Sequence, residues 1–199
     1  GSAVRIMYVH VPSAWLSLFS YLMLAICSFF FIIWRHPLAD ILSRSIAPVG
    51  ALFALLTLVT GSIWGRPMWG TWWEWGDPRL TSELLMLFLY LGYMALRASI
   101  NDTQKADKLS SIFILVGAIN VPVIHYSVEW WSSLHQTSTL LKLDGPSIAT
   151  SMLIPLMATI IGTMLYFISL LLIRVRAEVI YRHRRSKWVR ELILEGKNV

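Results

Sequence analysis

Five long apolar stretches divide the chain, with short polar segments between them. Each is about 20 residues long, enough to cross a hydrocarbon layer roughly 30 Å thick as an α-helix. Lipid offers the backbone no hydrogen-bond partners, and the alternation typical of a membrane β-barrel is absent, so these stretches must be helical. The pattern predicts an all-α polytopic membrane protein with one domain over residues 1–199. The expected spans cover residues 13–34, 46–64, 80–98, 110–129 and 148–173.

Composition supports this interpretation. Hydrophobic residues make up 56% of the chain and charged residues 14%, whereas soluble domains carry roughly 25% charged residues. The net charge of +6 could suggest nucleic-acid binding, but 8 of the 17 Lys and Arg residues lie in the tail, residues 174–199. Such a tail is typical of the cytoplasmic side of a membrane protein, so we expect contact with lipid and none with nucleic acid. The single cysteine, Cys27, excludes a disulfide framework and covalent c-type haem attachment.

The basic residues also predict the orientation. Thirteen Lys and Arg residues fall on the side of the tail and four on the other side. Because the richer side is cytoplasmic, we expect residues 1–12, the tryptophan-rich loop 64–79 and the second loop 130–147 to face outward. The chain then begins outside without a start methionine. We therefore expect a further span upstream, six in the full-length protein, although Gly1-Ser2 could instead be left from cloning.

Tryptophan is concentrated on the outer side. Five of the ten tryptophans lie between residues 64 and 75. An aromatic belt at the lipid headgroups would be spread over many helix ends, so we favour a platform for a flat apolar ligand. Glycines and prolines in the same loop predict a compact, structured connection. The platform candidates are Trp64, Trp69, Trp72, Trp73, Trp75, Trp130 and Trp131.

Two outer histidines, His10 and His135, lie near these tryptophans. Imidazoles from two different segments suit the axial positions of a haem iron. A zinc site is the alternative and would need more ligands, for which Glu74, Asp77 and Asp144 are the outer carboxylates.

Several other charged residues accompany the histidines. The two propionates of a haem need cations, and Arg5 and Arg79 are candidates because arginine binds carboxylates with two parallel bonds; Arg66 is equally well explained as a solvated surface charge. His125 and Glu129 share one helix face in the fourth span. A proton relay is one interpretation of that pair, but we favour a polar contact between helices.

Three segments together resemble one known family. The run WGRPMWGTWWEWGDPRLTSELL is similar to the "WWD" segment of the haem-handling superfamily, and RIMYVHVPSAW and VPVIHYSVEWWSSLHQ are similar to segments of the haem exporter protein C (CcmC) family. The resemblance extends from Arg5 to the tail sequence WVRELIL. It places the axial ligands of the family on His10 and His135 and its motif arginines on Arg5 and Arg79. The chain has one residue more than the usual WxWDxRLT pattern, near Gly76, and Asp77 is a further candidate.

The resemblance implies a function in cytochrome c maturation. Family members have six spans, bind haem b non-covalently and transiently at the periplasmic face of the bacterial inner membrane, and load it onto the haem chaperone CcmE. They act with CcmA, CcmB and the small protein CcmD. The chain itself has no Walker-type, GxSxG or HExxH motif, so we expect no enzyme activity and ATP hydrolysis only in a partner subunit.

Three alternatives remain open at this point. A haem permease subunit of an ABC-type exporter would need a polar or aromatic path between helices. A proton- or cation-coupled transporter would use His125 and Glu129. A quinone-linked cytochrome b would need pairs of histidines within the spans, where only His125 lies.

Overall fold

The computed structural model describes residues 5–131, 133–135 and 148–195. These residues form helices joined by short connections, and within the described ranges there is no strand. The helices are α1 (Met7–Trp34), α2 (Pro37–Trp69), α3 (Pro78–Ser99), α4 (Thr103–Gly117), α5 (Asn120–Trp130), α6 (Thr150–Arg182) and α7 (Lys187–Glu195).

Five helical segments are long and apolar enough to cross a membrane, with α4 and α5 counted together as Thr103–Trp130. The prediction of a polytopic all-α membrane protein with five spans is therefore confirmed. Most helices extend beyond the apolar stretches: α1 begins at Met7, α2 continues to Trp69 and α6 continues to Arg182. The fourth segment is interrupted between Gly117 and Asn120, close to Pro122, whose missing N–H weakens the helix.

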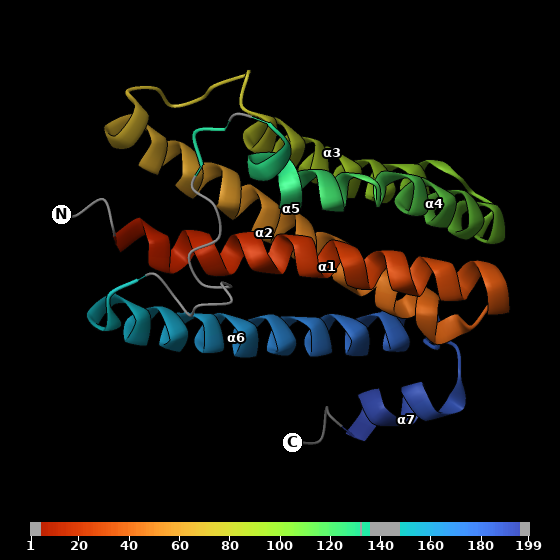
Figure 1. Cartoon of the computed structure of the whole chain (residues 1–199). Helices are drawn as coiled ribbons and strands as arrows, with labels where there is room; N and C mark the ends of the chain where they lie inside the picture. Colours follow the sequence, from red (N-terminus) through yellow and green to blue (C-terminus); the bar gives the residue numbers. More distant parts are fainter. Residues whose placement is uncertain (1–4, 132, 136–147, 196–199) are drawn as a thin grey trace.

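Helix α1 runs through the middle of the bundle and packs most extensively against α2, with α4 and α6 on other sides (Figure 1). Tyr21 of α1 and Tyr90 of α3 meet edge to face at 5.2 Å in the core. Glycine allows this packing, since a Cβ at Gly50 would lie 2.4 Å from the Tyr90 hydroxyl and one at Gly117 would lie 2.3 Å from the Tyr21 hydroxyl. Small residues thus let the helices approach closely around two large aromatic side chains.

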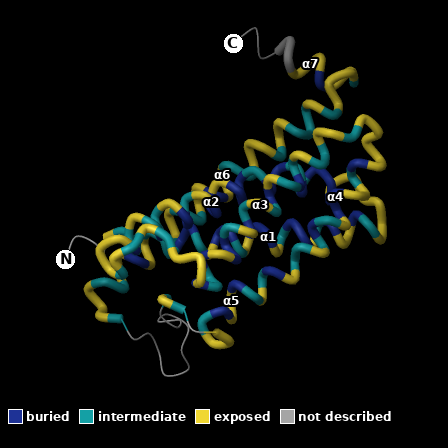
Figure 2. The backbone as a smooth tube through the Cα atoms, turned by 90° about the horizontal axis from the view of Figure 1, so that it is seen from above, coloured by how far each residue is buried: buried dark blue, intermediate teal, exposed yellow. Residues whose placement is uncertain are grey.

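The distribution of side chains is that of a protein surrounded by lipid. Helix α1 buries Ser17 and Ser20 against its neighbours, while Leu22 and Ile26 are exposed. Figure 2 shows exposed positions along the outer sides of the helices and buried ones toward the centre of the bundle. Helix α6 is mostly exposed although strongly apolar. Apolar side chains that would be unfavourable in water are stable against lipid tails.

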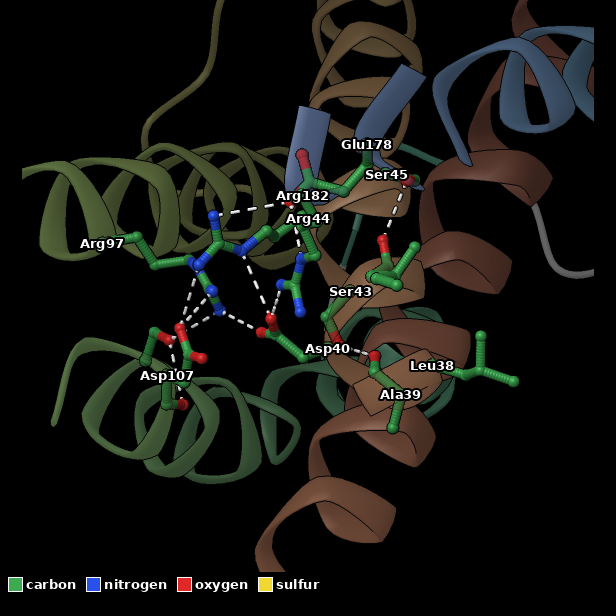
Figure 3. A network of polar contacts seen from close by, with 12 residues as sticks. Leu38, Ala39, Asp40, Ser43, Arg44, Ser45, Arg97, Asp107, Glu178 and Arg182 are labelled. Atoms are coloured by element: carbon green, nitrogen blue, oxygen red, sulfur yellow. Dashed lines mark hydrogen bonds and ion pairs between the residues drawn. The ribbon is translucent and has the colours of Figure 1, made fainter. Parts of the chain in front are cut away.

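A cluster of six charged side chains joins four helices (Figure 3). The helix ends that carry it lie at the end of the bundle opposite the tryptophan-rich segment (Figure 1). Asp40 is 2% exposed and contacts Arg97 at 2.7 Å, as well as Arg182. Arg44 reaches Asp107 at 3.2 Å and Glu178 at 3.5 Å. This ion cluster contains Asp40 and Arg44 from α2, Arg97 from α3, Asp107 from α4, and Glu178 and Arg182 from α6.

The ion cluster explains why α2 and α6 are longer than the apolar pattern predicts. Their additional turns carry Asp40, Arg44, Glu178 and Arg182 out of the apolar stretches to where the four helices meet. Three arginines and three carboxylates neutralise one another, so charges at the edge of the lipid are paired as their burial requires.

Replacing Asp40 with alanine should destabilise the bundle strongly. The variant would leave Arg97 and Arg182 facing a buried space without their shared carboxylate. Removing one partner of a buried ion pair costs roughly 3 kcal/mol or more. Thermal unfolding of the detergent-solubilised protein, followed by circular dichroism, would measure this as a clear fall in Tm.

The matched control is Glu191→Ala, because Lys187 and Glu191 form an exposed pair 3.7 Å apart on α7. Exposed pairs contribute only about 0–1 kcal/mol, so its Tm should hardly change. Equal effects of the two substitutions would show that the ion cluster does not hold the helices together.

Candidate functional site

The tryptophan-rich segment lies where α2 ends and α3 begins. Helix α2 ends at Trp69, and Gly70 adopts a left-handed conformation with φ of 80° that ends the helix. Arg66 donates to the Gly70 carbonyl, which gives this candidate propionate ligand a structural role at the helix end. Because α2 is longer than expected, the non-helical part of the loop covers only residues 70–77.

Asp77 is the main connecting residue of the site. One carboxylate oxygen caps α3, accepting from the backbone N–H of Arg79 at 3.0 Å and of Leu80 at 2.9 Å. The other oxygen accepts from the Ser133 hydroxyl at 2.7 Å and the Leu134 N–H at 2.8 Å. One buried side chain therefore fixes both the start of α3 and the segment that carries His135.

These hydrogen bonds set the charge of Asp77. Burial acts to raise the pKa of its carboxyl, but the donors on Leu80, Ser133 and Leu134 outweigh burial and hold that pKa below its usual value. The carboxylate is therefore ionised at neutral pH and presents a negative charge to His135.

His135 is held beside this carboxylate. Its Nδ1 lies 3.5 Å from an Asp77 oxygen, and its backbone N–H donates to the Ser133 hydroxyl at 3.1 Å. Burial lowers the pKa of His135 below its usual value; Asp77 opposes this shift and Arg79 adds to it. The imidazole is thus neutral at pH 7, the form that binds metals, and its Nε2 is not engaged by these contacts.

His10 is oriented through its Nδ1 as well. That nitrogen lies 3.0 Å from the Thr60 hydroxyl oxygen, and the Thr60 hydroxyl itself donates to the Leu56 carbonyl at 2.6 Å. The hydroxyl proton is used in the second bond, so Nδ1 of His10 must be the donor in the first. Nε2 of His10 therefore keeps a free lone pair. The ring packs on Gly61, where a Cβ would lie 3.2 Å from Cε1.

The structure brings both histidines and one candidate arginine together. His10 lies within electrostatic range of His135 and of Arg79, and Arg79 also acts on His135. A hydroxyl holds Nδ1 of His10, and the hydrogen bonds of Ser133 and Leu134 to Asp77 hold the segment of His135, whose Nδ1 lies 3.5 Å from the carboxylate. Contacts of this kind orient histidines that bind a metal through Nε2.

The tryptophans surround this arrangement without sharing one plane. The ring of Trp69 meets the rings of His135 and Trp64 edge to face, with 4.9 Å and 5.3 Å between ring centroids. Trp73 and Trp75 form a separate pair whose ring centroids lie 5.5 Å apart. The Trp73 indole N–H is buried and has no hydrogen-bond partner among the described residues. A buried donor of this kind can bind an acceptor on a ligand.

A second aromatic group extends from α5. Trp130 stacks on Tyr126 at 5.3 Å and meets Trp131 at 5.7 Å. Trp72, Trp75, Trp130 and Trp131 are all more than half exposed. The aromatic surface is therefore largely open, as a docking surface for a flat ligand requires.

Among the described residues, the remaining candidates form no hydrogen bond or ion pair with either histidine. Arg5 is exposed just before α1. His125 and Glu129 are both exposed on α5, so the interhelical contact expected for them is not formed within the described residues. Asp144 and most of the predicted loop 130–147 lie outside the described residues.

The zinc alternative finds no support in the described part of the chain, where no group of three or more His, Cys, Asp or Glu side chains is arranged to hold a metal ion. Sequence reasoning missed Thr60 and Ser133, which orient the two histidines. A single hydroxyl inside an apolar stretch gives no signal of such a role; the Asp-Pro pair at residues 77–78, in contrast, does mark a helix start.

Comparisons with known proteins identify the family of the chain. A family model described as Heme exporter protein C matches residues 1–190. The chain is 47% identical to Heme exporter protein C of Bradyrhizobium diazoefficiens over 94% of its length and 70% of that protein. It is 45% identical to the protein of the same name from Escherichia coli K12 over 98% of its length and 78% of that protein.

A mitochondrial relative is also similar. A ccmC-like protein of Marchantia polymorpha, named for cytochrome c biosynthesis, is 49% identical over 78% of the chain and 65% of that protein. The match of the family model over almost all of the sequence shows that the chain belongs to the Heme exporter protein C family.

Proposed function

We propose that the protein binds haem at the tryptophan-rich end of the bundle and delivers it to the haem chaperone CcmE during cytochrome c biogenesis. Haem is the cargo, held non-covalently and transiently as haem b. His10 and His135 provide the two axial ligands. The family and the names of its members support haem handling in this process.

The observation that carries the proposal is the orientation of the two imidazoles. Nδ1 of His10 is hydrogen-bonded to Thr60, and Nδ1 of His135 lies 3.5 Å from Asp77, so these contacts leave Nε2 of each ring free. Two neutral imidazoles occupy both axial positions of an iron and leave no position for oxygen. The chain thus protects its cargo by ligation and needs no catalytic group of its own.

The surrounding residues suit the rest of a haem. Arg79 lies near both histidines and can form two parallel bonds to a propionate, with Arg5 near the start of α1 as the second cation. Trp69 lies against His135, and the exposed rings of Trp72 and Trp75 offer contact area for the porphyrin.

The charge distribution and the family support the proposed cellular setting. The tryptophan-rich end faces the periplasm of a bacterial inner membrane, and the C-terminal tail, with most of the basic charge, faces the cytoplasm. CcmA, CcmB and CcmD are the proposed partners, and ATP hydrolysis belongs to a partner subunit.

The alternative functions fit the structure less well. A transporter using His125 and Glu129 needs them inside the bundle, but both are exposed on α5. A permease needs a path between helices, whereas Tyr21, Met86 and Tyr90 fill the centre of the bundle with fully buried side chains.

Replacing either His10 or His135 with alanine should abolish the low-spin spectrum of haem added to the purified protein, because each variant removes one axial ligand. Absorption spectra of the oxidised and reduced protein measure this. His125→Ala is the control and should keep the spectrum, since His125 is exposed on α5. A low-spin spectrum in both single variants would contradict the ligand assignment.

Replacing Arg79 with alanine should weaken haem retention by about 10- to 100-fold while the low-spin spectrum persists, because a charge-assisted hydrogen bond contributes roughly 1.5–3 kcal/mol. Haem titration and transfer to CcmE provide the measurements. Arg79→Lys keeps the charge but loses the planar fork of the guanidinium. Its haem retention should therefore lie between that of the unsubstituted protein and that of Arg79→Ala. Full retention and transfer in Arg79→Ala would remove this residue from the site.

Replacing Asp77 with asparagine should weaken haem binding by about 10- to 100-fold, as is usual for residues that orient a metal ligand. An amide has only one acceptor oxygen, so it cannot accept hydrogen bonds both from the start of α3 and from the segment that carries His135. The control is Asp102→Asn, which alters the cap of α4 at Lys105 and touches neither histidine. Equal affinities of the two variants in a haem titration would show that Asp77 does not support His135.

A further inference from the structure

A cavity of about 360 Å³ opens beside the ion cluster, where α2 and α6 meet. Figure 3 shows Arg44, Ser45 and Glu178 together in this region. The cavity lies at the end of the bundle that carries the basic tail, because Arg174 directly follows the apolar stretch 148–173. Its lining contains Arg44 and Ser45 from α2 and Arg174, Ala177, Glu178 and Tyr181 from α6.

Arg44 has donors left for a ligand in this cavity. Its side chain is 30% exposed, and its Nη2 donates to Asp107 at 3.2 Å. Its Nη1 lies 3.5 Å from a carboxylate oxygen of Glu178, and among the described residues it takes part in no hydrogen bond. Because a guanidinium has five N–H donors, Arg44 can bind a further anion without leaving the ion cluster.

The charge around the cavity favours an anion. The ion cluster is neutral, and Glu178 is already bonded to Arg182 at 3.1 Å. Arg174 adds a positive charge, since it is exposed. Arg184 adds another, because its guanidinium lies 4.3 Å from the centroid of the exposed Tyr181 ring. Within the described part of the chain, neither Arg174 nor Arg184 forms an ion pair.

The walls of the cavity continue into apolar surface. Ile173 also lines the cavity, and Tyr166 lies two turns away on the same face of α6; both are more than half exposed. On α2, Leu52 lies two turns from Ser45 and is exposed as well. The start of α2 contacts the end of α6, so the two helices are antiparallel. Leu52 and Tyr166 therefore both lie deeper in the spans than the charged lining.

We propose that this cavity binds the phosphate of an anionic phospholipid from the leaflet on the side of the basic tail, an inference independent of the proposed haem function. The acyl chains lie along Ile173, Tyr166 and Leu52. Arginine binds phosphate through parallel hydrogen bonds, and basic pockets between helices on the cytoplasmic side suit such headgroups. The positive charge of Arg174 and Arg184 disfavours a zwitterionic lipid, whose choline adds a further cation.

Native mass spectrometry of the purified full chain in detergent tests the choice of lipid. Titration with dioleoylphosphatidylglycerol should give a Kd for the first bound lipid about tenfold lower than titration with dioleoylphosphatidylcholine. Both lipids carry a phosphate and the same acyl chains, so the difference reports the headgroup charge. Equal Kd values would overturn the proposal.

Inorganic phosphate separates a lipid site from a site for a free anion. At equal concentration, phosphatidylglycerol should raise the Tm clearly, because it joins α2 to α6, and inorganic phosphate should raise it much less, because it has no chains to cover Ile173 and Leu52. An equal rise in Tm would overturn the assignment to a lipid.

Replacing Arg174 with glutamine should weaken the binding of phosphatidylglycerol about tenfold, the effect of losing one charge-assisted hydrogen bond. Arg176→Gln is the matched control. Arg176 is exposed two residues further along α6, on the opposite side of the helix and outside the lining, so its Kd should change by less than about twofold. Equal losses in the two variants would show general attraction to a basic surface and overturn the site.

A steric variant tests the cavity without changing any charge. Ala177→Phe fills the space beside Arg174 and should also weaken binding of phosphatidylglycerol about tenfold. Ala158→Phe, at an exposed position of α6 outside the lining, should leave the Kd unchanged. Neither variant touches the ion cluster, and an unchanged Tm without lipid would verify that both are folded. Full binding by folded Ala177→Phe would overturn the proposal.

Discussion

The carboxylate of Asp77 holds together two parts of the chain that are more than 50 residues apart. It caps the start of α3 with one oxygen and binds Ser133 and Leu134 with the other. Its four hydrogen bonds tie the segment of His135 directly to the start of α3, where Arg79 lies.

Polar groups of α3 connect the two ends of the molecule. Arg79 and Glu83 lie at the tryptophan-rich end, the hydroxyls of Tyr90 and Tyr93 bond in the middle, and Arg97 joins the ion cluster at the other end. Helix α3 has a lower mean hydropathy than the other candidate spans. It can remain in the bundle because its polar side chains bond to α1, α2 and α4.

The apolar pattern was sufficient to predict five spans, since lipid allows long apolar stretches only one backbone structure. It could not predict the ion cluster, because Asp40, Arg44 and Glu178 are separated in sequence and only the packing of four helices brings them together. The clustering of tryptophans and the positions of His10 and His135 pointed to one end of the bundle. His125 and Glu129 do share one helix, α5, but their spacing could not show whether the shared face turns toward a neighbouring helix, and both are exposed.

The bond between His10 and Thr60 has a consequence for the speed of exchange. Since the Thr60 hydroxyl already donates to Leu56, the imidazole proton stays on Nδ1 whether or not anything is bound at Nε2. Under the proposed function, haem that arrives at Nε2 displaces no proton from this nitrogen. Exchange of haem at His10 would then need no proton donor or acceptor, which suits the proposed role of a carrier.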